Sequence, residues 1–144
     1  MLTNRKRTIL AHLMLVAGAG GVLATGADHL DEYATNGFST VPTIGTLFLL
    51  NFIAATLVGV ALLLPLRRIT QRFGDPVRTL LALGGIGIAA TSLIALWISE
   101  SSSLFGFTDY GFRSTIVAAV VAEGIAIVGL TTYLALARHR TLAS

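Results

Sequence analysis

The chain has 144 residues, of which 54% are hydrophobic and only 12% are charged. A soluble domain carries about 25% charged residues, so this composition excludes a water-soluble globular protein. Cysteine is absent, which excludes disulfide frameworks, thiolate metal sites and cysteine nucleophiles, and the formal net charge is +3.

Four apolar stretches are long enough to cross a membrane as helices: residues 8–26, 44–64, 79–98 and 116–137. Crossing the hydrocarbon core takes about 20 apolar residues, because a helix rises about 1.5 Å per residue. The termini and the three connections are too short to hold another domain. We therefore predict one all-α domain, residues 1–144, built as a bundle of four transmembrane helices.

The first stretch also has features of a cleavable signal peptide, because it follows basic residues and ends at Ala24-Thr25-Gly26-Ala27. Its apolar run is longer than a signal peptide needs. We therefore predict a signal-anchor helix that stays in the membrane.

Short motifs mark where the predicted helices stop and start. Asn36-Gly37 tolerates positive φ and predicts the end of any extension of the first helix beyond the bilayer. Asp75 followed by Pro76 predicts an N-cap at the start of the third helix, since proline is well accommodated at the first helical position. Both motifs are interpreted as structural.

Asp28, His29 and Glu32 form the densest polar cluster of the chain, directly after the first stretch. If the helix continues past the membrane, Asp28 and Glu32 share one face, and His29 lies beside Glu32. An imidazole and two carboxylates suit a divalent cation, but a metal site needs further ligands, for which Glu100 and Asp109 are the candidates. Without them the cluster is a solvated loop, and we predict no metal.

Glu123 is the only acidic residue deep within any of the four stretches. A charged side chain there costs roughly 2.5–3.5 kcal/mol on insertion scales, so such residues usually face a bundle interior or a wet cavity. Asn51 lies at the same depth, because each residue is the eighth of its stretch counted from the same side. Two interpretations stay open: Glu123 is a proton or cation site, or it is a protonated acid that hydrogen-bonds Asn51 across helices.

The basic residues predict the orientation of the chain. Nine of the ten Lys and Arg residues lie in the terminal segments and in the second connection, and only Arg113 lies on the other side. Because short cytoplasmic loops retain Lys and Arg, both termini are predicted to be cytoplasmic. This pattern requires no nucleic-acid partner, and it adds an attraction of the inner face for anionic lipid headgroups of the bilayer.

Small residues recur at four-residue spacing on every predicted helix, which allows close helix packing in lipid. Examples are Ala17 with Gly21, Gly20 with Ala24, Ala55 with Gly59, Gly85 with Ala89, Gly87 with Thr91, and Ala122 with Ala126. These faces serve contacts within the bundle, with a second copy or with other membrane subunits.

The two halves of the chain carry related motifs before their second helices. Glu32-Tyr33 and Gly37-Phe38-Ser39-Thr40 precede the second stretch, while Asp109-Tyr110-Gly111-Phe112 and Ser114-Thr115 precede the fourth. One interpretation is a 2+2 parallel repeat about an axis normal to the membrane. The other is that such sequences recur at membrane interfaces.

Residues 29–51 contain His29, Tyr33 and the run from Val41 to Asn51, VPTIGTLFLLN. This segment resembles small four-helix integral membrane proteins of high-GC Gram-positive bacteria, which are generally uncharacterised. The resemblance implies a bacterial plasma membrane location and carries no activity.

No enzymatic motif is present: the chain has no GxSxG, no HExxH and no phosphate-binding loop. We therefore expect no enzyme and no cofactor. The preferred interpretation is an accessory or structural subunit of a membrane complex. The alternative is a small oligomeric transporter or channel, coupled to protons or cations through Glu123.

Overall fold

The computed structural model describes residues 3–108 and 114–141. Within these residues the chain forms four long helices, α1 (Asn4–Ala34), α2 (Ile44–Leu63), α4 (Gly74–Ser101) and α5 (Ser114–Thr141). Three short segments connect them: η1 (Phe38–Thr40), α3 (Leu66–Thr70) and η2 (Gln71–Phe73). Each long helix has the length and apolar composition to cross a membrane, so the prediction of an all-helical chain with four candidate spans is confirmed.

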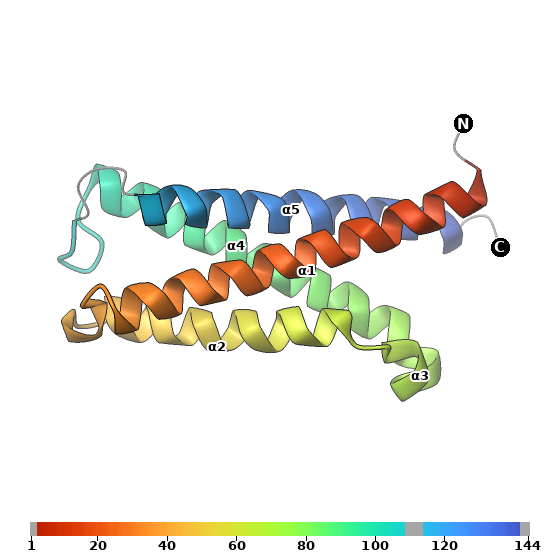
Figure 1. Cartoon of the computed structure of the whole chain (residues 1–144), viewed down its shortest axis with the longest axis horizontal. Helices are drawn as coiled ribbons and strands as arrows, with labels where there is room; N and C mark the ends of the chain where they lie inside the picture. Colours follow the sequence, from red (N-terminus) through yellow and green to blue (C-terminus); the bar gives the residue numbers. More distant parts are fainter. Residues whose placement is uncertain (1–2, 109–113, 142–144) are drawn as a thin grey trace.

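The long helices lie side by side, with α1 packed against both α2 and α5 (Figure 1). Helix α4 also contacts α2 and α5, whereas α2 and α5 hardly touch each other. The start of α1, the end of α5 and α3 lie at one end of the bundle.

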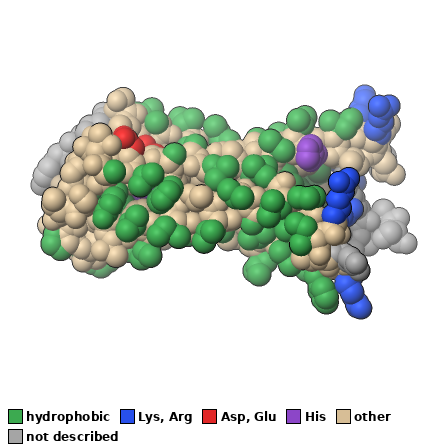
Figure 2. Space-filling view, turned by 60° about the horizontal axis from the view of Figure 1, so that its bottom comes forward, with side chains coloured by type: hydrophobic (Ala, Val, Ile, Leu, Met, Phe, Trp, Pro, Cys, Tyr) green, Lys and Arg blue, Asp and Glu red, His purple; other side chains and the backbone are tan. Residues whose placement is uncertain are grey.

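We call this end the basic end, because Lys and Arg side chains gather there (Figure 2). Its described basic residues are Arg5, Lys6, Arg7, Arg67, Arg68, Arg72, Arg78 and Arg138. The opposite end, with the α1–α2 and α4–α5 connections, is the acidic end. Its described acidic residues are Asp28, Asp31, Glu32 and Glu100.

Helices α1 and α5 approach so closely that their backbones are in contact. A Cβ added at Gly21 would lie 2.6 Å from the backbone nitrogen of Ala126, and one at Gly129 would lie 2.7 Å from that of Gly18. Small residues permit this approach and so provide van der Waals packing between helices in lipid. Gly20, by contrast, has open space beside it. The small residues of α1 therefore form a buried face and an exposed face.

An apolar core fills the middle of the bundle. Val22 of α1, Ala55 of α2 and Leu130 of α5 are all 0% exposed and belong to one cluster of buried side chains. Ala82 of α4 and Leu134 of α5 continue the cluster toward the basic end. The core therefore separates the polar groups of the acidic end from those of the basic end.

Helix α1 continues past its predicted end at residue 26 and stops at Ala34. The stop predicted at Asn36-Gly37 is confirmed, because Gly37 has a φ of 83°, a conformation that favours glycine. This extension carries Asp28, His29 and Glu32 on a helix instead of a loop.

The predicted N-cap role of Asp75 is wrong. Helix α4 begins at Gly74, so Phe73 occupies the cap position and Asp75 lies in the first turn. The Asp75 carboxylate instead accepts two hydrogen bonds from Arg67, both 2.7 Å long. A planar guanidinium offers two parallel donors to a carboxylate, a stronger arrangement than a single backbone N–H.

Three sequence predictions depend on residues 109–113, which lie outside the described residues. They are the repeat motif at Asp109-Tyr110-Gly111-Phe112, together with Asp109 as a metal ligand, and Arg113 as the exception to the charge pattern.

Candidate functional site

Three helices bring polar side chains together at the acidic end. His29 comes from α1, Ser92 from α4 and Glu123 from α5, and all three line a cavity of about 60 Å³. Asp28 and Glu32 line the same cavity, because residues one helical turn apart share a face of α1. The structure thus joins two groups of residues that the sequence treats as separate, the polar cluster after the first span and the buried acid of the fourth.

A chain of hydrogen bonds crosses the site from α1 to α5. Nδ1 of His29 donates to the carbonyl oxygen of Thr25, 2.9 Å away, so Nε2 of the neutral ring is an acceptor. The hydroxyl of Ser92 lies 3.1 Å from this Nε2. Ser92 also hydrogen-bonds the carboxyl group of Glu123. One hydroxyl therefore links an imidazole to a carboxyl group.

The ionisable groups of this site are withdrawn from solvent. Glu123 is 1% exposed, Glu32 is 6% exposed and His29 is 8% exposed. Aromatic rings cover the site, because Phe48 packs edge-on against the His29 ring at 5.0 Å and Phe38 contacts Phe48 at 4.9 Å. Such burial makes every unbalanced charge in the cavity costly.

The charges around the cavity do not balance. Asp28, Glu32 and Glu123 contribute three carboxyl groups, and among the described residues that line the cavity none is Lys or Arg. The charge of Asp28 acts on Glu123, and Oε2 of Glu123 is buried with no hydrogen-bond partner. Three carboxyl groups that share one largely buried cavity form a candidate site for a proton or a cation.

Asn51 does not belong to this site. Its Oδ1 atom is buried without a hydrogen-bond partner, and the expected hydrogen bond between Asn51 and Glu123 is not formed. The reason is lateral position, since α1 lies between α2 and α5 (Figure 1). Equal depth in the membrane places two residues at one level and leaves open which helices are neighbours.

Sequence reasoning missed Ser92 and the aromatic cover. A single serine in an apolar helix is common and signals no particular role, and only its contacts with His29 and Glu123 distinguish it. Across the described residues, no three His, Asp or Glu side chains are grouped as a metal site. Comparison of the chain with protein-family models, with curated proteins and with solved structures finds no match.

Proposed function

We propose that this chain is a small, non-enzymatic membrane protein that couples proton binding at its acidic end to transport, working as an oligomer. A single observation supports this function: the partly buried hydrogen-bond chain from His29 through Ser92 to Glu123. Intramembrane ionisable groups of this kind mark proton relays in pumps and transporters. A lone glutamate favours a structural role, but here a second ionisable group is linked to it and two more carboxyl groups line the cavity.

The Ser92 hydroxyl has one proton and supports two arrangements of the chain. In the first, Glu123 is protonated and donates to Ser92 Oγ, and Ser92 donates to Nε2 of neutral His29. Moving the Glu123 proton to Ser92 and the Ser92 proton to Nε2 gives the second, with an ionised Glu123 and a charged His29. Two protons shift together, the net result is the transfer of one proton from Glu123 to His29, the net charge is unchanged, and Ser92 again carries one hydroxyl proton.

An oligomer is part of this proposal because one bundle gives the proton no route across. Val22 and Leu130 are fully buried in the apolar core between the acidic-end cavity and the basic end. The exposed glycines Gly20, Gly84 and Gly87 have open space around them, so a helix of a second copy can approach closely there.

The test is proton flux into proteoliposomes that carry a pH-sensitive dye, driven by an imposed pH difference. Glu123→Gln and Ser92→Ala are expected to reduce the flux to that of empty vesicles, because each removes one link of the relay. Ser101→Ala is the matched control, since the Ser101 hydroxyl donates only to backbone carbonyls of its own helix, 2.7 Å from that of Trp97. Wild-type flux in Glu123→Gln would rule the relay out.

A second candidate is the accessory subunit of a larger membrane complex. It is favoured by the exposed apolar surface of α2 and α4. Only 17% of the most apolar stretch of each of these helices is buried within the chain. Purification in mild detergent, followed by mass determination of the intact complex, separates the two functions. A stoichiometric foreign subunit supports the accessory role, whereas a homo-oligomer supports transport.

We also infer a bacterial plasma membrane location with the basic end cytoplasmic. The resemblance of residues 29–51 supports the location, and the gathering of Lys and Arg at one end supports the orientation. The chain has no native cysteine, so single substitutions give an unambiguous label. An impermeant maleimide added to intact cells is expected to label Ser103→Cys and to leave Arg68→Cys unlabelled. The 2+2 repeat stays a prediction.

A further inference from the structure

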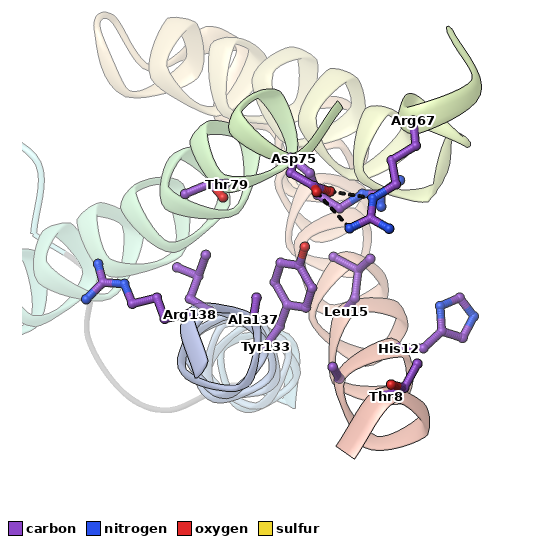
Figure 3. A pocket seen from close by; sticks show the side chains of 12 residues that line it. Thr8, His12, Leu15, Arg67, Asp75, Thr79, Tyr133, Ala137 and Arg138 are labelled. Carbon is purple, nitrogen blue, oxygen red and sulfur yellow. Dashed lines mark hydrogen bonds and ion pairs between the residues drawn. The ribbon is translucent and has the colours of Figure 1, made fainter. Parts of the chain in front are cut away.

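A second, much larger cavity opens at the basic end of the bundle. Its volume is about 500 Å³, and it lies between α1, α4, α5 and the short helix α3 (Figure 3). Polar and charged side chains from all four elements line it. They include Thr8, His12, Arg67, Asp75, Arg78 and Arg138.

Positive charge is in excess around this cavity. Arg67 is paired with Asp75, the only acid among the described lining residues, through two hydrogen bonds of 2.7 Å. Arg78 and Arg138 have no carboxylate partner among these residues. Nη2 of Arg78 donates to the carbonyl oxygen of Leu64 at 2.8 Å, while its Nε is buried with no hydrogen-bond partner.

The cavity also has the two kinds of wall that a lipid headgroup requires. Arginine and threonine side chains offer N–H and O–H donors, and the apolar side chains of Leu15, Leu134 and Ala137 complete the lining. Arginine is well suited to phosphate, because its fork of N–H groups matches two phosphate oxygens. The cavity lies near the helix ends, which is the level of the headgroups in a spanning bundle.

We propose that this basic-end cavity binds a phosphate group, that of an anionic lipid such as phosphatidylglycerol. The site is independent of the proton relay, from which the apolar core separates it. A free phosphate or a phosphorylated solute presents the same chemistry, and the experiment below distinguishes these sources. Basic pockets between membrane helices on the cytoplasmic side hold anionic headgroups by this combination of charge and shape.

The experiment is native mass spectrometry of the full chain, purified in detergent after reconstitution with equal amounts of phosphatidylglycerol and phosphatidylcholine. Wild type is expected to retain one phosphatidylglycerol per chain. The double variant Arg78→Gln/Arg138→Gln is expected to retain about thirtyfold less, because each basic residue near an anionic headgroup contributes a factor of about five. The variant Arg78→Lys/Arg138→Lys keeps both charges and is expected to recover most of the retention.

The matched control is Arg68→Gln/Arg72→Gln, which removes the same charge from the same end at two residues that do not line the cavity. It is expected to retain lipid like wild type. Arg78→Gln also removes the hydrogen bond to the carbonyl oxygen of Leu64 and can prevent folding for that reason. In that case Arg138→Gln alone is the test, and it is expected to retain about fivefold less phosphatidylglycerol than wild type.

Inorganic phosphate at millimolar concentration separates the two sources of the ligand. If it leaves phosphatidylglycerol in place, the ligand is the lipid. If it displaces the lipid or binds alone in lipid-free detergent, the same site takes a soluble phosphate. Equal retention of the two lipids, or equal losses in the cavity variant and its control, overturns the proposal.

Discussion

Ionisable groups are concentrated at both ends of the bundle, but those of the acidic end are buried and those of the basic end are exposed. At the acidic end, Glu123 is 1% exposed and shares a cavity of about 60 Å³ with other carboxyl groups. At the basic end, Arg67 and Asp75 are 64% and 58% exposed and lie beside a cavity of about 500 Å³.

This difference indicates what each end is able to bind. Ionisation of a buried carboxyl group has a high desolvation cost. Such a group is therefore suited to binding a proton or a small cation, which neutralises its charge. An exposed arginine keeps its charge and its hydration, so it attracts an anion without changing its own state. Small size and burial suit the acidic end to protons, and openness suits the basic end to a bulky headgroup.

The largest predicted effect tests whether the acidic end is built for function or for stability. We expect Glu123→Leu to raise the free energy of unfolding by about 1–3 kcal/mol, because it removes a buried carboxyl group whose Oε2 atom has no hydrogen-bond partner and leaves Ser92 bonded to His29. Glu123→Gln, which keeps the shape and polarity, is the comparison. Both free energies are measured by denaturant unfolding in mixed micelles. A strong destabilisation of Glu123→Leu would contradict this prediction. It would show that the cluster stabilises the packing of the helices, which favours a structural role over a functional one.

The next effect concerns the close backbone contact between α1 and α5. Gly21→Ala is expected to lower the free energy of unfolding by about 1–3 kcal/mol, because the new methyl group meets the backbone of α5 and forces the helices apart. The neighbouring Gly20→Ala is the control, since nothing lies within 4 Å of its Cβ. The same micelle assay applies. Equal losses in the two variants would contradict the close crossing and show only a general response to a larger side chain.

The sequence predicts those features of the two ends that depend on a single segment of the chain. Hydropathy locates all four helices, because crossing a membrane demands length and apolar composition from each helix separately. The rarity of intramembrane charge identifies Glu123 as a candidate, and the density of polar residues identifies His29 and its neighbours. Each of these signals is local to one segment.

The assembly of the site is not local, and for this reason the sequence does not predict it. Depth and helical angle fix where Glu123 and Asn51 lie on their own helices, but they do not determine which helices are neighbours. The contact between α1 and α5 brings Glu123 to His29 and keeps it away from Asn51. Ser92 has a role only because of that arrangement. A single serine in an apolar helix does not by itself indicate a site. The helical extension that carries His29 depends on a stop at Gly37, which the sequence does indicate.

The smallest predicted effect lies in the exposed ion pair of the basic end. Arg67→Gln is expected to lower the free energy of unfolding by at most about 1 kcal/mol, because exposed ion pairs gain little in water and are screened by salt. Arg68→Gln, at the adjacent exposed arginine, is the control. Repeating the micelle measurement at high salt should remove the difference between wild type and Arg67→Gln.

The pH dependence of this pair has a definite sign. The hydrogen bonds and charge of Asp75 raise the pKa of Arg67 above its usual value. A base with a raised pKa in the folded state contributes stability that is complete below its unfolded pKa and is lost only as the pH rises through the folded value. Arginine stays charged far above neutral pH, so this contribution is constant from neutral to moderately alkaline pH. A difference between wild type and Arg67→Gln that changed between neutral and moderately alkaline pH would contradict the ion pair and, with it, the contrast between the two ends.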